Sequence, residues 1–451
     1  MQHLFISKKI ILVYALMIIA LIYSSSIFGQ SNYSINTNNK NGKSIIRIKN
    51  DGTDFKIEYE GEITISDDDK DIISISNGGF FEIKKSSFGS RRRILIESDR
   101  NGKLIKRYYV GGTEKNFIPE GKKWLAEILP EVLRSTTIGA KSRVARFYKK
   151  GGVNSVTNEI RQIDSDFIKA KYFEIILAYK LSSKELVSVI EQVGKQIKSD
   201  HYLAEILKSN QSAFLANSET VNAYIKASGN IKSDHYLTAV LKKVINNKSV
   251  SDSQLGDLLE ISKNINSDHY LTEVLTEIMD NRSLNSNNIA KIIDISENIS
   301  SDHYKTQVLK KVINERNIPI SAYDALISTI GNINSDHYTT EVIKELLDTK
   351  LDSNKKALDG ILEIVNNNIN SDHYATVIYK KIAKQNLSED QLIAVLNSVK
   401  SINSDHYLTE ILLAYSGKVK RSSESVKNAY RNSVKSIHSD TSYGRAAKAI
   451  D

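Results

Sequence analysis

The chain has 451 residues, of which 40% are hydrophobic and 25% charged, and this balance excludes wholesale disorder. It contains no cysteine, which excludes disulfide bonds and thiolate metal sites. The net charge is +9, and from Lys418 onward eight Lys or Arg stand against three acidic residues. Because nucleic acid usually requires a basic stripe along a whole face, we expect no nucleic-acid partner. The basic C-terminal region indicates an anionic envelope surface as a partner, or simply a solvated surface.

Residues 1–30 have the order of a secretory signal peptide. Lys8 and Lys9 precede an uncharged apolar run from Ile10 to Tyr23, and small and polar residues follow. We expect cleavage of this segment and export to the periplasm or cell envelope of a bacterium. The alternative is an uncleaved helix that anchors the protein, although the apolar core is short for a membrane span.

Residues 31–43 are rich in Asn and Ser and are expected to form a flexible lead-in. Between 44 and 117, short runs of alternating polar and apolar residues are separated by Asp-Gly, Asn-Gly and Gly-Gly pairs, which is typical of β-hairpins. The sequence therefore predicts an antiparallel β module of about six strands. Residues 118–152 are predicted to be a helical connector, with Trp124 on its apolar face and a helix stop at Gly151-Gly152.

Two charged groups in the β module are candidate sites. The acidic turn 67–69 with Asp71 could bind calcium, or it could be an ordinary hydrated turn. The second group is a basic edge that could hold an anionic glycan or lipid head group, and whose alternative role is to prevent strands from aggregating. It comprises Arg91, Arg92, Arg93, Lys106 and Arg107.

From residue 153 to residue 451 the chain is organised around the tetrapeptide Ser-Asp-His-Tyr. Its seven copies are Ser199, Asp200, His201, Tyr202; Ser233, Asp234, His235, Tyr236; Ser267, Asp268, His269, Tyr270; Ser301, Asp302, His303, Tyr304; Ser335, Asp336, His337, Tyr338; Ser371, Asp372, His373, Tyr374; and Ser404, Asp405, His406, Tyr407. The spacings of 34, 34, 34, 34, 36 and 33 residues fit one helical hairpin per repeat. With degenerate copies at Ser165 and Ser439, we predict an α-solenoid of about nine repeats.

Each tetrapeptide reads as the start of a helix. Serine is a favoured N-cap, and an aspartate in the first turn interacts well with the positive end of the helix dipole. A branched apolar residue stands seven positions after each serine, and an isoleucine stands two positions before it. These positions and the tyrosine are predicted to pack between helices.

Seven of the nine histidines lie in these tetrapeptides, which raises the alternative of a metal-binding or proton-carrying ladder. Adjacent Asp and His diverge on a helix instead of converging on one ion, so we favour a structural role, in capping and in hydrogen bonds between repeats. A buried histidine array would respond to pH. No metalloprotease, nucleophile-elbow or phosphate-loop motif occurs, so we predict no enzymatic activity and no cofactor.

The repeats resemble HEAT- and TPR-type solenoids. More narrowly, the segment 124–130 with Arg134, and the stretch 143–146 leading to Gly151-Gly152, followed by Ser-Asp repeats, resemble a bacterial exported family of unknown function. Similar repeats follow zinc-peptidase sensor domains of the antibiotic-sensing type, whose peptidase motif this chain lacks. The expected fold is α+β and mainly α, and the expected function is a non-enzymatic scaffold that binds a protein on its solenoid face. The alternatives are an adhesive or ligand-binding protein that uses the β module, and a metal-dependent hydrolase.

Overall fold

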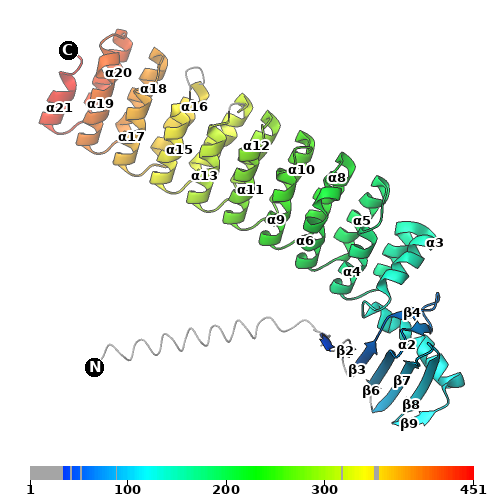
Figure 1. Ribbon diagram of the computed structural model, residues 1–451. Helices are drawn as coiled ribbons and strands as arrows, with labels where there is room; N and C mark the ends of the chain where they lie inside the picture. Colours follow the sequence, from blue (N-terminus) through cyan, green and yellow to red (C-terminus); the bar gives the residue numbers. More distant parts are fainter. Residues whose placement is uncertain (1–33, 41–42, 51–52, 88, 316–317, 350–354) are drawn as a thin grey trace, which may run out of the picture. The chain divides into compact units, whose positions relative to one another are not determined.

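The computed structural model describes residues 34–40, 43–50, 53–87, 89–315, 318–349 and 355–451 (Figure 1). The chain divides into two compact units, Met1–Ile175 and Ile176–Asp451. Residues 1–30, with their predicted signal peptide or anchor, lie outside the described residues. Within the described ranges, no helix has both the length and the apolar character needed to cross a membrane.

The first unit contains an antiparallel sheet of seven described strands and a separate two-stranded sheet (Figure 1). In spatial order the large sheet consists of β1 (Ser34–Lys40), β2 (Lys43–Asn50), β3 (Thr53–Glu60), β6 (Phe80–Ser87), β7 (Ser90–Ser98), β8 (Leu104–Val110) and β9 (Thr113–Lys115). The small sheet pairs β4 (Ile63–Ile65) with β5 (Ile72–Ile75). The stretch expected to be a flexible lead-in contains strand β1, so residues 34–40 differ from that expectation. The strand can form there because main-chain pairing with β2 does not require apolar side chains.

One face of the large sheet is covered by helix α2 (Lys122–Arg134), which follows a short π-helical turn, η1 (Phe117–Gly121). Alternate strand residues such as Ile57, Ile83 and Ile94 are fully buried against it. From the helix, Trp124 packs on the sheet, with its ring 5.8 Å from that of Tyr108. Period-two alternation in the strands and an apolar helix face thus produce one core, as the sequence pattern predicts.

Helix α3 (Ala140–Ile160) follows α2 and is broken at Gly151-Gly152. Gly152 has φ +61° and ψ −155°, a conformation that is easily reached only without a Cβ. The predicted helix stop is therefore present, and a second helical segment resumes at Val153 after it.

The rest of the chain alternates between two sets of helices (Figure 1). Nine described helices begin at the aspartate of a tetrapeptide or of one of its degenerate copies: α4 (Asp166–Leu177), α6 (Asp200–Ser209), α9 (Asp234–Ile245), α11 (Asp268–Asn281), α13 (Asp302–Ile313), α15 (Asp336–Asp348), α17 (Asp372–Ile382), α19 (Asp405–Val419) and α21 (Asp440–Ala447). Between them lie α5 (Ser183–Gln196), α8 (Ser218–Ser228), α10 (Asp252–Ser262), α12 (Ser286–Ser296), α14 (Tyr323–Gly331), α16 (Lys355–Asn367), α18 (Glu389–Ser398) and α20 (Glu424–Val434). Three further short helical segments are α7 (Gln211–Phe214), η2 (Ile320–Ala322) and η3 (Val399–Ser401).

In the second unit each set forms its own layer. From α6 to α21 each aspartate-started helix contacts the next one, and from α5 to α20 each intervening helix contacts the next intervening one. The branched residues seven positions after the serines are all buried: Ile206, Val240, Val274, Val308, Val342, Ile378 and Ile411. So are the isoleucines two positions before the serines: Ile163, Ile197, Ile231, Ile265, Ile299, Ile333, Ile369, Ile402 and Ile437. The fold is α+β and mainly α, and the predicted inward positions of the repeat are confirmed.

Candidate functional site

The aspartate of each tetrapeptide joins its repeat to the next. Asp234 Oδ2 accepts a hydrogen bond from the backbone N–H of Ser267 at 2.8 Å, and its Oδ1 accepts one from Asn266 N–H at 3.2 Å. We call this pair of bonds the aspartate clamp. The aspartate-to-serine distance is 2.7 Å for Asp200–Ser233, 2.7 Å for Asp268–Ser301, 2.9 Å for Asp302–Ser335, 2.8 Å for Asp336–Ser371, 2.8 Å for Asp372–Ser404 and 2.8 Å for Asp405–Ser439.

The serines occupy the N-cap position, but their hydroxyls contribute little to capping. At the starts of α9, α11, α13, α15 and α17 the serine side chain makes no capping hydrogen bond, whereas Ser404 accepts from Tyr407 N–H at 3.5 Å. What the serine supplies is an N–H for the clamp of the preceding repeat. Helix start and repeat junction are therefore one structural feature.

The histidines and tyrosines form a continuous row along the helix starts, which we call the histidine–tyrosine ribbon. His201 Nδ1 lies 3.3 Å from the hydroxyl of Tyr236 in the next repeat, and the following three pairs are 3.4 Å apart. Ring centroids are 5.1–5.3 Å apart within a repeat and 5.8–6.0 Å apart between repeats, in edge-on or tilted arrangements. Such geometries are favourable for aromatic quadrupoles.

All seven histidines of the ribbon are exposed and the tyrosines are half-buried, so the condition for a pH response of this kind, burial of the histidines, is not met. A helix start places the second side chain of the helix outward, while the third turns toward the neighbouring repeat. Among the described residues, no group of three or more His, Cys, Asp or Glu lies close enough together to hold a metal ion.

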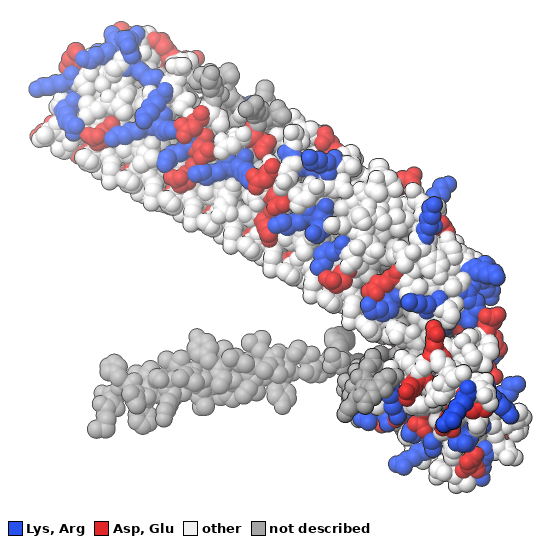
Figure 2. Space-filling view, viewed as in Figure 1, with Lys and Arg blue, Asp and Glu red and all other residues white. Residues whose placement is uncertain are grey.

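A charge alternation between successive aspartate-started helices was not predicted. Helices α9, α13 and α17 carry a Lys-Lys pair, and α11 and α15 carry a glutamate, Glu277 or Glu345, at the position of the second lysine. Lysines of these pairs form ion pairs with neighbouring helices. Nitrogen–oxygen distances are 2.7 Å for Lys242–Glu273, 3.5 Å for Lys310–Glu341, 3.4 Å for Lys310–Glu345 and 3.1 Å for Lys380–Glu410, and Lys311 and Lys381 pair with Asp280 and Asp348. Positive and negative groups are correspondingly interspersed on the visible face of the repeats (Figure 2). The charge pattern therefore recurs every two repeats, and it is visible in the sequence when every second repeat is aligned.

In the first unit, Arg143 is the centre of a buried ion network. Its side chain is fully buried, and its Nη2 donates to Asp69 Oδ2 at 2.9 Å and to Glu159 Oε1 at 2.6 Å, while Nη1 donates to the Tyr172 hydroxyl. Burial by itself lowers the pKa of this guanidinium, but its anionic and hydroxyl partners outweigh burial and the pKa is raised. Burial raises the pKa of Glu159, yet Arg134 and Arg143 outweigh it and the pKa is lowered.

This network accounts for the acidic turn. Asp69 is paired with Arg143 and also with Arg146, 2.5 Å away, and Asp71 is paired with Lys106 at 2.5 Å. These two carboxylates are therefore neutralised by basic side chains, which argues against the calcium alternative. Arg134, Arg143 and Arg146 belong to the stretches that carry the family resemblance, so the sequence already marked these arginines as candidates for a shared structural role.

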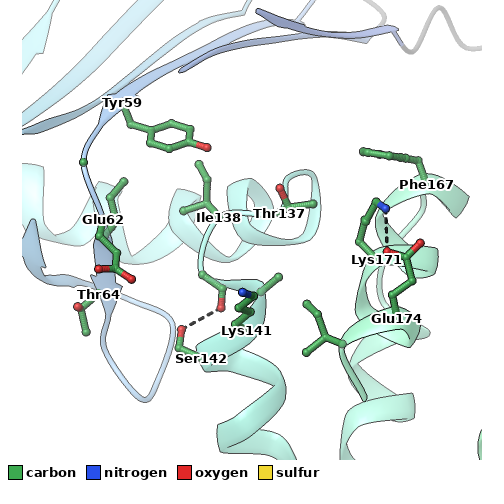
Figure 3. Close-up of a pocket in the computed structure, with 15 residues that line it drawn as sticks. Tyr59, Glu62, Thr64, Thr137, Ile138, Lys141, Ser142, Phe167, Lys171 and Glu174 are labelled. Carbon is green, nitrogen blue, oxygen red and sulfur yellow. Dashed lines mark hydrogen bonds and ion pairs between the residues drawn. The ribbon is translucent and has the colours of Figure 1, made fainter. Parts of the chain in front are cut away.

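A cleft of about 710 Å³ lies between the end of β3, the α2–α3 loop and α4 (Figure 3). Tyr59 and Ile138 stand on one side of it and Phe167 on the other. Phe167 remains 42% exposed, which is unusual for a large aromatic side chain. Lys171 lies beside Phe167 and is paired with Glu174 at 2.7 Å. The cleft offers apolar walls with a charged rim, and only the tertiary structure brings together lining residues so distant in sequence.

The structure separates the five residues of the predicted basic edge. Arg91, Arg93 and Arg107 share one face of the sheet by alternation, while Lys106 has the opposite parity and pairs with Asp71. Arg107 is paired with Glu97 at 2.8 Å. Arg91, Arg92 and Arg93 instead line a hollow of about 300 Å³ with Lys84 and Tyr109. The arginines of β7 thus form a site from which Lys106 and Arg107 are absent.

No family model matches the chain, and no curated protein matches it. A solved structure described as a computational design of self-assembling cyclic protein homooligomers aligns with 69% of this chain and 96% of its own, at 12% identity and a TM-score of 0.13. A similarity this low carries no argument about this protein.

Proposed function

We propose that the helical repeats act as a non-enzymatic scaffold that binds a protein partner. The observation that supports this proposal is that the invariant and the variable residues of the repeats have different roles. Those that are identical from repeat to repeat are used for stacking, through the aspartate clamp and the ribbon. The exposed helix surface, in contrast, changes from one repeat to the next and is left to select a partner.

The variation is seen at one exposed or half-exposed helix position, ten residues after each serine. It holds Lys243, Glu277, Lys311, Glu345 and Lys381 in successive repeats, and the last four of these also form ion pairs with a neighbouring repeat. A surface with alternating charge discriminates between partners, because like charges brought together across an interface oppose the wrong register. This supports recognition of one protein with a complementary charge pattern.

The proposed location is the bacterial envelope, reached by export. It rests on the N-terminal signal pattern and on the resemblance to exported bacterial proteins that combine a β module with Ser-Asp helical repeats. The basic C-terminal region would then face an anionic envelope surface, although some of its charge is used internally: Arg445 pairs with Glu410 at 3.1 Å.

Site-specific photo-crosslinking in the full-length protein tests the scaffold. A crosslinkable residue is placed at exposed positions of the repeats, Ser253 in α10 or Asn287 in α12, and at the exposed Ser74 of β5 as a matched control. Envelope extract of the producing cells supplies the partner. We expect one protein to be crosslinked from the repeat positions and not from Ser74. Equal labelling from Ser74, or no product above an irradiated blank, contradicts the scaffold.

A further inference from the structure

The hollow lined by Lys84, Arg91, Arg92, Arg93 and Tyr109 lies on the large sheet, at the end of the β6–β7 hairpin. Lys84, Arg91 and Arg93 point to the face opposite α2, because their neighbours Ile83 and Ile94 are fully buried against the helix. The site is therefore built on paired strands and not on a free loop.

Its charges do not balance. Glu82 is the carboxylate within reach: its oxygens lie 2.6 Å from Lys84 Nζ and 2.5 Å from Arg93 Nε. Arg91 and Arg92 are exposed, and neither has an acidic partner among the described residues. Lys84, Arg91 and Arg93 share the face of this one carboxylate, which leaves two net positive charges on the side of the sheet that carries the hollow.

This arrangement of like charges lowers the stability of the sheet. Lys84 stands directly opposite Arg93 across the strands, on the face that carries the hollow. Like charges in opposed positions destabilise a strand pair. Protection of an edge strand does not explain them, because β7 is paired on both sides, with β6 and with β8. A ligand that neutralises the excess charge does explain them.

Some of the side chains that line the hollow are also held in position without a ligand. The Arg93 guanidinium lies 4.5 Å from the centre of the Tyr109 ring, and Glu82, only 6% exposed, fixes both Arg93 and Lys84. Guanidinium groups bind tetrahedral oxyanions through paired, charge-assisted hydrogen bonds, and less ordering entropy is lost when the groups are already positioned.

We propose that this hollow binds a phosphate-type oxyanion, with Arg91 and Lys84 as ligands and Arg93, held by Glu82 and Tyr109, as the third. Arg92 borders the hollow and also lines a second one beside Trp124. The proposal is independent of the protein partner of the repeats. The same chemistry is presented by a free phosphate compound and by a phospholipid head group.

Calorimetric titration of the full-length protein with pyrophosphate at low salt tests the site. Arg91→Gln is expected to weaken binding roughly tenfold, since one charge-assisted contact is lost, and Arg91→Lys is expected to recover part of the loss. The matched control is Arg107→Gln, on the same face but outside the hollow and paired with Glu97, which we expect to change affinity less than about twofold.

Flotation with vesicles containing an anionic phospholipid distinguishes the two sources. Vesicle binding that Arg91→Gln removes assigns the head group as ligand, whereas pyrophosphate binding without vesicle binding assigns a free phosphate compound. The proposal is overturned if neither probe binds, or if Arg107→Gln weakens binding as much as Arg91→Gln, since the attraction would then come from overall charge.

Discussion

The two units hold their elements together in different ways. In the first, one buried arginine, Arg143, connects the β4–β5 turn with helices α3 and α4, and Arg146 repeats only its contact with the turn. In the second, the clamp and the ribbon are small contacts that recur at successive junctions between repeats. Removing the Arg143 contacts is therefore expected to destabilise the whole first unit, whereas removing one clamp is expected to destabilise mainly the junction at which it lies.

The largest effect is expected from Arg143→Ala. It leaves the buried carboxylates of Asp69 and Glu159 without their shared partner, and breaking a buried ion pair costs about 3–5 kcal/mol. Urea unfolding of the full-length protein, followed through the fluorescence of Trp124, measures it. The control Arg161→Ala removes an exposed arginine at the end of the same helix and is expected to have almost no effect. Equal stability of the two variants would contradict the central role of Arg143.

A second prediction concerns acid. The pKa of Glu58 is lowered from 4.5 to about 2: burial opposes this, but hydrogen bonds from Lys43 and Lys56 outweigh burial. Because the folded-state pKa lies below the ordinary value, the stabilisation is present above pH 4.5 and is lost as pH falls through about 2.

The expected loss is at most about 3 kcal/mol, and Glu58→Gln is expected to remove this part of the pH dependence. Unfolding of the sheet module, monitored by Trp124 fluorescence from pH 5 to pH 2, is the measurement. An unchanged slope in the variant would show that Glu58 is not the group responsible.

In the repeats, Asp268→Ala removes one clamp and with it two hydrogen bonds to backbone N–H groups. We expect a loss of about 1.5 kcal/mol, concentrated at the junction between α11 and α13. Hydrogen exchange of the Ser300 and Ser301 amides reports it directly. Asp257→Ala, an exposed aspartate of α10, is the control and is expected to leave both amides protected. Uniform loss of protection across all repeats would contradict the local nature of the clamp.

The smallest effect is expected from the charge alternation. Lys242→Glu and Glu273→Lys should each destabilise the protein by up to about 1 kcal/mol, because like charges then face each other, and the double variant should restore most of the loss. A double-mutant cycle from thermal unfolding at low and high salt measures the coupling. Strictly additive losses would mean that the alternation does not contribute to repeat order.

The repetitive half of the protein was largely predictable. Helix periodicity, the 34-residue spacing and the positions of Val274 and Ile265 follow from sequence, because each repeat contacts its neighbours at a constant distance along the chain. The exposure of the histidines could not be predicted, since the tetrapeptide alone does not show which of its side chains faces the next repeat. The charge alternation is present in the sequence, but it recurs every two repeats and not every repeat.

For the β module, the sequence determined the positions of β2 to β8, the turns and the apolar face of α2, all of which depend on local alternation, but not β1, β9 or the separate pairing of β4 with β5. It did not determine that Asp69 meets Arg143, that Phe167 borders a cleft with Tyr59, or that Lys106 lies on the opposite face of the sheet from Arg91, Arg93 and Arg107. These relations depend on strand register and on contacts between residues far apart in sequence, which only the tertiary structure decides. The repeats were readable because their contacts are periodic, and the sites of the β module were not, because each of their contacts occurs once.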